Sequence, residues 1–494
     1  MTDTIPLGPA VPAAPTAPVA AASTELLPLK TKLAFGVGSA AEMIAIYTVA
    51  TFAMLFYNQV LGVNPVWVGL ALSVSLVFDA ITEPLVGAWS DRTFSTRFGR
   101  RHGWMLASPI PIAVSFYCIF NPPDLGPLGL AIWCGVSVGM LRQVMTFFHT
   151  PHLALGGELS PHYTERSKVM AYNAFFQWVG GSATAWIALT FFFPRTEQFH
   201  NGLLNPEPWP QFALAGAIAI IVILYASTIF TMDRIPLLPK TAPNTPKFSL
   251  REFFRDIVRA LGNVSYAWLL AGYFFLSMMV GLREGLRLYM ASFYWQINSS
   301  DLRWFIIGSF IGYILAFFFA ARMHGRFDKK ATMIAACLGY AIVPAIAPTL
   351  GMMGLLKADS PLLLPILIAL GAFGYLAISF LTISVTSALA DIADENELKH
   401  GIRQEGILYS TRAFAGKLDQ AVGAALAGFV VSFIAFPRKA TPGQVPEDVL
   451  FNLALWDGVV TIVPGVLAAI CYGRYRINHT TYLETRRLLA ERRG

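Results

Sequence analysis

The stretch VSLVFDAITEPLVGAWSDRTFSTRFGRRHGW, from Val74 to Trp104, decides the fold that we expect for this chain. It begins as an apolar run that suits a helix in lipid. Asp79 and Glu83 lie four residues apart in this run, so both carboxylates fall on one helix face. Each ionised carboxylate at the bilayer centre costs about 2.5–3.5 kcal/mol on insertion scales, so the pair must face a bundle interior or a wet cavity. The stretch therefore predicts a membrane helix with a functional acidic face.

The composition supports a polytopic membrane protein. Of the 494 residues, 55% are hydrophobic and only 13% are charged, far from the usage of a soluble domain. The net charge of +7 is divided among loops between apolar runs instead of forming one patch, so we expect no nucleic-acid partner. The four cysteines lie inside apolar runs without metal-ligand spacing, and we expect buried free thiols and no metal site.

Apolar runs of roughly 20 residues can cross a bilayer core of about 30 Å. The chain contains twelve such runs, and we predict an all-α integral membrane protein with twelve transmembrane helices. The expected spans are 33–61, 65–91, 103–122, 126–155, 166–194, 209–232, 262–297, 302–322, 330–352, 360–391, 405–436 and 450–474.

Loop charge predicts the orientation of these helices, because loops on the cytoplasmic side retain Lys and Arg. If both termini are cytoplasmic, 26 of the 36 Lys and Arg residues lie on the inside, five lie outside and five fall within spans. We therefore expect a multi-pass protein of the plasma membrane, or of the inner membrane in a Gram-negative bacterium, with both termini in the cytoplasm.

The order of segments predicts two six-helix bundles, 29–232 and 262–478, joined by a central cytoplasmic loop over 233–261. This loop contains SLREFFRDIVRAL, in which apolar and basic residues alternate as in an amphipathic helix on an anionic membrane face. The Ala- and Pro-rich segment 1–28 is expected to be a disordered tail, and 479–494 a basic cytoplasmic tail. The basic turns DRTFSTRFGRR and RMHGRFDKK occupy corresponding places and suggest two parallel repeats.

Four stretches carry a resemblance to a known family. They are FGVGSAAEM at 35–43, FDAITEPLVGAWSDRTFSTRFGRR at 78–101, PHLALGGELSPHYTERS at 151–167 and ADIADENELKHGIRQEGILYSTRAFAGKLDQA at 390–421. Together they resemble the major facilitator superfamily, and within it the glycoside–pentoside–hexuronide:cation symporters. This family includes the melibiose/cation symporters and is related to the sodium-dependent lysophospholipid symporters.

The resemblance implies a cation, Na⁺ or H⁺, bound at Asp79 and Glu83, with no other cofactor. Thr82 lies beside the pair as a further oxygen ligand, and Glu42 is a secondary candidate for the cation site. The family's basic residue of the eleventh helix falls on Lys417, which would neutralise the acids when the cation is absent. Like charges resist joint ionisation, so the residues themselves also predict a bound cation. The alternative is a static ion cluster that locks the two bundles.

The substrate positions depart from the melibiose-type pattern. Where those members hold an Asp and a Trp around the proline of helix four and an Arg on helix five, this chain holds His149, Leu153 and either Asn173 or Ala174. Galactoside contacts of that kind are therefore not reproduced. His149 shares a helix face with Arg142 and can titrate near neutral pH, although a neutral histidine bonded to a carbonyl group is equally compatible.

Helix 262–297 offers further candidate substrate contacts, Arg283, Arg287 and Tyr289. The two arginines share a face, and two guanidinium groups at one cavity would suit a carboxylate, sulfate or phosphate. The alternative is interhelical pairing, for example with Glu284 or Glu42. We expect a gating role for residues at the cytoplasmic ends of helices, namely Asp91, Arg92, Arg100, Arg101 and Arg412.

These observations favour a secondary active symporter of a small organic solute, of glycoside or hexuronide type or otherwise anionic, working by alternating access as a monomer in the lipid bilayer. A lysolipid or another amphiphile is the alternative substrate of the same fold. A non-transporting scaffold or receptor is the alternative of another class. An enzyme is not expected, because the chain has no G-x-S-x-G, H-E-x-x-H or Walker A motif.

Overall fold

The structure is a computed structural model, and it describes residues 26–93, 95, 97–160, 162–238, 249–326, 328–400, 405–477 and 479–493. The tail expected over 1–28 lies outside this part except for its last three residues. The Pro-rich part of the central loop, 239–248, also lies outside it.

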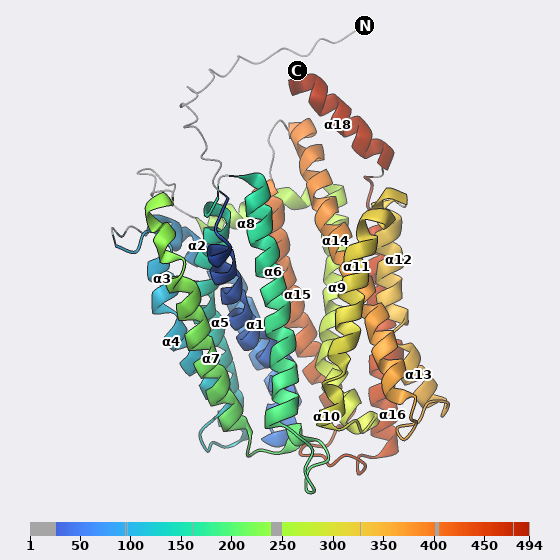
Figure 1. Ribbon diagram of the computed structural model, residues 1–494. Coiled ribbons are helices and arrows are strands. Elements are labelled where there is room, and N and C mark those ends of the chain that lie inside the picture. Colours follow the sequence, from blue (N-terminus) through green and yellow to red (C-terminus); the bar gives the residue numbers. More distant parts are fainter. Residues whose placement is uncertain are drawn as a thin grey trace.

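Within the described residues the chain is helical, and nine of its helices are long and apolar enough to cross a membrane. The shorter apolar α4 and the helices α6 and α11 run alongside these nine in the same bundle (Figure 1). The expectation of an all-helical membrane protein is confirmed. The expected number of twelve spans remains a prediction.

We call the first group of helices the N-terminal half. Within it, α1 packs against α6 and α7, α2 packs against α5, and α4 packs against α5 and α7. The helices of this half are α1 (Leu29–Leu55), α2 (Pro65–Arg92), α3 (His102–Ala107), α4 (Pro109–Phe120), α5 (Pro127–Glu158), α6 (Tyr163–Ile187) and α7 (Trp209–Ile229).

We call the second group the C-terminal half. Within it, α9 packs against α15 and α17, and α14 packs against α11 and α12. The helices of this half are α9 (Val264–Tyr289), α10 (Ser299–Leu302), α11 (Phe305–Arg326), α12 (Lys329–Ile342), α13 (Ile346–Met352), α14 (Leu363–His400), α15 (Glu405–Phe433), α16 (Glu447–Leu455) and α17 (Ile462–Gly473). Two more helices, α8 (Leu250–Leu261) and α18 (His479–Arg493), lie outside both halves.

Several predicted spans differ from the observed helices in ways that follow from local chemistry. The span 103–122 is divided at Ser108, where Pro109 supplies no N–H group to continue the first helix. The span 330–352 is divided between Ile342 and Ile346, where Pro344 intervenes. Conversely, α14 continues to His400, nine residues past the predicted end, because hydropathy marks the edge of the membrane and not the end of a helix.

The two halves meet most closely where α2 packs against α15. A Cβ atom on Gly69 would lie only 2.8 Å from the carbonyl oxygen of Ala424 and 3.2 Å from Cα of Gly428. On the other side of α15, a Cβ atom on Gly281 of α9 would lie 2.7 Å from Cα of Gly423. Backbone therefore touches backbone on both sides of α15, and glycine permits this approach.

Hydrogen bonds between the halves close the end of the bundle that carries α10 and α16 (Figure 1). The hydroxyl group of Tyr289 donates to Oδ1 of Asn58 over 2.7 Å, and both side chains are fully buried. The amide of Asn201 donates to the hydroxyl group of Ser292, also over 2.7 Å. These contacts fix the two halves against each other at this end.

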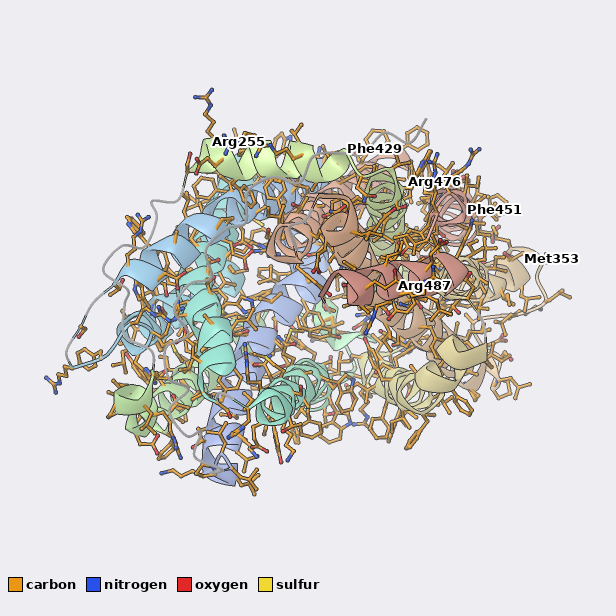
Figure 2. The ribbon with its side chains drawn as sticks, turned by 90° about the horizontal axis from the view of Figure 1, so that it is seen from above. Arg255, Met353, Phe429, Phe451, Arg476 and Arg487 are labelled. Atoms are coloured by element: carbon orange, nitrogen blue, oxygen red, sulfur yellow. The ribbon has the colours of Figure 1, made fainter. Side chains whose placement is uncertain are left out.

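At the opposite end, α18 lies across the tops of other helices, and α8 runs along one edge of the bundle (Figures 1 and 2). The rings of Phe253 and Phe254 on α8 each pack against Phe414 of α15, with centroids 5.8 Å apart. The segment 479–494, expected as a basic cytoplasmic tail, contains the helix α18, which packs on α14 and places the Tyr482 ring 5.1 Å from Nζ of Lys329. The basic segment therefore packs against the rest of the protein on one face, which its charge alone does not predict.

Large apolar side chains remain exposed around the outside of the bundle. Met353, Phe429 and Phe451 lie on this periphery (Figure 2), and each is at least half exposed. Exposed apolar side chains on this scale would favour aggregation in water, but they suit contact with lipid.

Candidate functional site

The acids of α2 and the lysine of α15 meet where the two halves touch. The ammonium group of Lys417 lies 2.7 Å from Oδ2 of Asp79 and 2.9 Å from Oε2 of Glu83. The four-residue spacing on α2 stacks the two carboxylates, so one ammonium group reaches both. The structure therefore brings together the three residues at the centre of the predicted cation site.

Two residues of α5 complete this cluster. The Thr146 hydroxyl group donates to Oδ1 of Asp79 over 2.7 Å, and the guanidinium group of Arg142 lies 4.0 Å from Oδ2. The two acids thus face two cationic groups, which compensates their charge. Thr146 was not predicted from the sequence, although its position four residues after Arg142 places it on the same helix face.

Thr82 makes a different contact from the one expected. Its hydroxyl group donates to the carbonyl oxygen of Phe78 over 3.0 Å and approaches that of Asp79 at 3.3 Å. Such bonds to the preceding turn are common for threonine in membrane helices. In this structure the hydroxyl group is engaged by the main chain of α2.

Glu42 lies in a second cluster, which we call the imidazole cluster and which consists of Glu42, His149 and His152. Oε2 of Glu42 lies 2.8 Å from Nδ1 of His149, and its Oε1 lies 3.2 Å from Nδ1 of His152. The sequence offered Glu42 and His149 separately, as cation and substrate candidates. It gave no sign of His152, whose ring stacks on Phe35 with centroids 4.3 Å apart.

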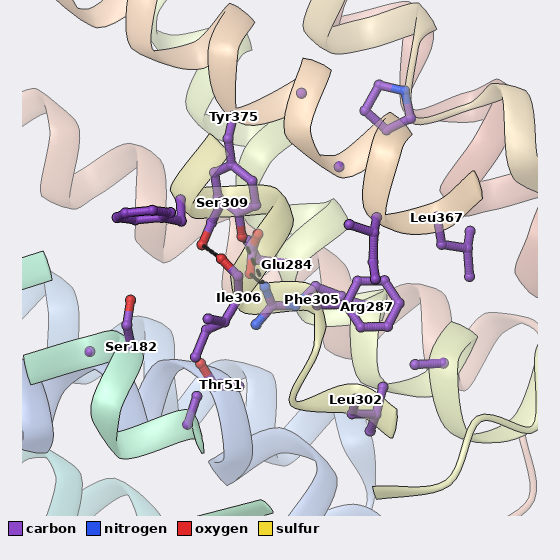
Figure 3. A pocket seen from close by; sticks show the side chains of 18 of the residues that line it. Thr51, Ser182, Glu284, Arg287, Leu302, Phe305, Ile306, Ser309, Leu367 and Tyr375 are labelled. Carbon is purple, nitrogen blue, oxygen red and sulfur yellow. Dashed lines mark hydrogen bonds and ion pairs between the residues drawn. The ribbon is translucent and has the colours of Figure 1, made fainter. Parts of the chain in front are cut away.

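A large cavity lies between the halves and is lined by residues of α1, α6, α9, α11 and α14. Its volume is about 970 Å³, at the upper end of the roughly 300–1,000 Å³ typical of small-molecule sites. Most of its wall is apolar or aromatic. Figure 3 shows Glu284, Arg287 and Tyr375 grouped on one side of the cavity, with Thr51 and Ser182 on the other.

The two candidate arginines of α9 line this cavity but differ in how they are engaged. Arg287 lies 3.4 Å from Glu284 and donates to the Tyr375 hydroxyl group over 3.3 Å, and its side chain is 34% exposed. Arg283 donates to the carbonyl oxygen of Tyr340 over 2.7 Å and to the hydroxyl group of Thr461 over 2.9 Å. It therefore fastens α9 to α12 and α17, which is the interhelical role weighed as its alternative.

The other substrate candidates lie outside the lining of the cavity. Tyr289 bonds Asn58 at the closed end of the bundle, and Asn173 accepts a hydrogen bond from the hydroxyl group of Ser39. Arg142 belongs to the acid cluster, and His149 belongs to the imidazole cluster. Sequence position alone could not separate these environments. The cavity residues Tyr47, Trp178 and Tyr375 were not predicted, because aromatic residues are frequent throughout the chain.

The predicted gating residues form ion pairs at the end that carries α8. Arg101 lies 2.6 Å from Oδ1 of Asp91 and 2.8 Å from Oε1 of Glu158, and Arg100 lies 2.5 Å from the same oxygen. Glu158 is the last residue of α5, and the sequence did not predict it as a gating residue. Arg92 is the last residue of α2.

The C-terminal half has a corresponding pair. Nζ of Lys329, at the start of α12, lies 2.7 Å from Oδ2 of Asp391 near the end of α14. The remaining gating candidate, Arg412, stands over the Tyr273 ring at 5.0 Å, within the contact of α15 with α9. A basic residue at a helix start thus pairs with an acid near a helix end in each half, as two related repeats would give.

Comparison with known proteins agrees with this architecture. The inner membrane symporter YicJ of Escherichia coli (strain K12) is 24% identical over 476 residues, covering 94% of this chain and 95% of YicJ. The isoprimeverose transporter of Lactiplantibacillus pentosus is 24% identical, with 90% and 89% covered. The sodium-dependent lysophosphatidylcholine symporter 1 of Gallus gallus is 23% identical, with 95% and 91% covered.

Among solved structures, a bacterial homologue of the human lysosomal transporter Spinster in an inward-facing, occupied conformation has a similar fold. Its TM-score is 0.62 at 12% identity, with 92% of this chain and 97% of that chain covered. The family model for MFS/sugar transport proteins matches residues 34–479. The resemblance drawn from the four sequence stretches is confirmed: this chain is a multi-pass membrane protein that belongs to the MFS/sugar transport protein family, which consists of transporters and not enzymes.

Proposed function

We propose that this protein is a cation-coupled symporter that moves a small organic solute by alternating access. The observation that carries the proposal is the contact of Lys417 with both Asp79 and Glu83 across the two halves. A cation bound to the acids would displace the ammonium group and break this link. Binding and release of the cation would therefore change the contact between the halves, which is the requirement for coupling.

The topology that goes with this function has twelve transmembrane helices in two six-helix bundles and both termini in the cytoplasm. Its support is the distribution of charge, because the basic helices α8 and α18 lie at one end of the bundle. The end closed by Tyr289 and Asn58 is then the outer end. The Asp91–Arg101 and Lys329–Asp391 pairs lie on the cytoplasmic side, where they serve as gating contacts.

For the solute we favour a compound of glycoside or hexuronide type, or another anionic compound. Arg287 offers a guanidinium group at the wall of the cavity, where Glu284 and Tyr375 hold it by long contacts, and such a group suits a carboxylate. The aromatic rings of Tyr47, Trp178 and Tyr375 can pack against a sugar ring or another apolar face. Isoprimeverose transport by a relative agrees with this class.

An amphiphile is the second candidate, and one observation favours it. Phe175 of α6 and Phe310 and Phe318 of α11 line the cavity, yet they are between 46% and 60% exposed. The cavity wall thus continues to the surface as apolar side chains, which suits an acyl chain. The lysophosphatidylcholine symporter among the relatives is consistent with this alternative.

Counterflow into proteoliposomes tests the function without requiring knowledge of the coupling ion. Vesicles loaded with one solute are diluted into the same labelled solute, across a panel of glycosides, uronates and lysophospholipids. Exchange of at least one class, faster than in vesicles that lack the protein, is expected. If no member of the panel exchanges in vesicles with verified protein insertion, the symporter proposal fails and the scaffold alternative gains support.

A further inference from the structure

The imidazole cluster lies apart from the acids that bind Lys417, and its contacts indicate how many protons its three side chains hold. The Glu42 side chain is 3% exposed and that of His152 is 2% exposed. Apart from the Nδ1 atom of His152, Oε1 of Glu42 has no hydrogen-bond partner among the described residues. A buried carboxylate oxygen without a donor has lost its hydration and gained no hydrogen bond in return, which is unfavourable.

The tautomer of His152 follows from its second contact. Its Nε2 lies 2.9 Å from the carbonyl oxygen of Phe35, which can only accept, so Nε2 carries a hydrogen. In a neutral ring, Nδ1 would then present a lone pair to Oε1 of Glu42 at 3.2 Å. Two lone pairs would face each other in a buried site. One added proton, on either atom, converts this repulsion into a hydrogen bond.

His149 connects this buried pair to its surroundings. Its Nδ1 can donate to Oε2 of Glu42 in the neutral ring, and its side chain is 31% exposed, far more than the other two. The charges of Glu83 on α2 and Lys417 on α15 act on His149, and His102 on α3 is the titratable neighbour of His152. His149 is therefore the member of the cluster that can exchange a proton with the space between the halves.

We propose that Glu42, His149 and His152 form a proton-binding site, in which Glu42 and His152 share one proton and His149 exchanges it. The site is distinct from the cation site at Asp79 and Glu83. A proton that adds to Nε2 of His149 forms one N–H bond, while the Nδ1 hydrogen of the same ring passes to Oε2 of Glu42 and forms an O–H bond. Rotation of the Glu42 carboxyl group then turns this O–H group toward Nδ1 of His152, and the reverse transfers release the proton.

The position of Glu42 on α1 gives this proton a role in transport, and that role rests on the proposed symport function. Met43 and Tyr47, which follow Glu42 on the same helix, line the solute cavity. A change of charge at Glu42 alters the attraction between α1 and α5, and α1 also forms the cavity wall. Proton occupancy of the cluster therefore biases solute binding.

Proton uptake by the purified full-length protein in lipid nanodiscs tests the site without a solute. Bound protons are titrated between pH 9 and pH 5 for the wild type, Glu42→Gln and His152→Gln, with Glu197→Gln in an exposed loop as the matched control. An ordinary carboxylate near pKa 4.3 stays ionised over this range. The wild type is expected to bind about one proton more than Glu42→Gln, while Glu197→Gln matches the wild type.

Superimposed titration curves for the wild type and Glu42→Gln would overturn the proposal. His152→Gln keeps an amide donor for the Phe35 carbonyl group, and it should lose the same proton. If Glu42→Gln does not give a monodisperse folded protein, an unchanged proton count in His152→Gln overturns the proposal instead. Counterflow of the solute panel is measured separately, so loss of transport with an intact proton titration sinks only the symport function.

Discussion

The ammonium group of Lys417 lies 2.7 Å from Oδ2 of Asp79, although 338 residues separate the two in the chain. This contact joins α15 of the C-terminal half to α2 of the N-terminal half, the same two helices whose glycines bring the halves into backbone contact. Glu83 lies 2.9 Å from the same nitrogen, so a single ammonium group contacts both acids. The chemistry of coupling can therefore be tested with substitutions at three positions.

Removing either acid should abolish concentrative uptake. Asp79→Asn and Glu83→Gln preserve shape but each removes one negative charge that would hold a cation. We expect gradient-driven accumulation to fall to the level of empty vesicles, measured as labelled-solute uptake into proteoliposomes. Asp124→Asn, in an exposed loop, is the matched control and should accumulate solute normally. Full accumulation by either acid variant would refute the cation-site assignment.

Lys417→Ala should uncouple transport while the protein still inserts and folds. Without the ammonium group the two carboxylates repel each other, so they retain a cation or proton more tightly and release it less readily. Accumulation should be lost or weakened, with a changed ratio of cations to solute. Solute flux and cation flux measured in the same vesicles give this ratio. An unaltered ratio and pH profile would count against the role of Lys417.

Replacing Na⁺ by choline at fixed pH should identify the coupling ion. The longer acid at Glu83 and the main-chain bond of Thr82 loosen a compact Na⁺ cage, whereas both acids can carry a proton. We expect uptake to persist in choline and to collapse with a protonophore. Loss of uptake that millimolar Na⁺ restores would instead establish sodium coupling.

Tyr289→Phe should loosen the closed end of the bundle. The substitution removes one hydrogen bond between the halves, worth about 1 kcal/mol, and so shifts the open-to-closed ratio at this end by roughly fivefold. Distances between spin labels placed across this end would report the shift. Tyr57→Phe is the matched control, because the buried Tyr57 hydroxyl group donates to Ile119 within the N-terminal half. Equal distance distributions in both variants would contradict the role of Tyr289.

Sequence alone could predict the acid cluster because its chemistry is local or costly. Asp79 and Glu83 are stacked by helical spacing, buried charge calls for a compensating cation, and the family resemblance points to Lys417 as the charge partner. The hydropathy that locates helices, however, does not say which faces meet. Nothing in the sequence around His152 indicates a functional role, and only its contacts with Glu42 and Phe35 in the structure distinguish it.

The contacts of Arg283 with main-chain carbonyl groups could not be predicted from hydropathy either. Its partners include carbonyl oxygens of Tyr340 and Ala341, which lie in the last turn of α12, where carbonyl groups have no partner within the helix. These acceptors exist only because the expected span 330–352 is divided. In a continuous helix these carbonyl groups would be bonded within the helix, and the arginine would then be available to a solute. The division of the span thus provides the carbonyl oxygens that bind Arg283, and the sequence did not predict this division.

The close glycine contacts hold α15 against α2 near Gly428, so the helix can tilt about this point. At about 1.5 Å of rise per residue, Lys417 lies roughly 16 Å from that point and the start of the helix at Glu405 roughly 34 Å. A tilt about Gly428 therefore displaces Glu405 about twice as far as Lys417. A movement of the ammonium group by one bond length away from Asp79 is thus accompanied by about twice that displacement at Glu405, and Phe414, which lies between these two positions, carries the motion to α8.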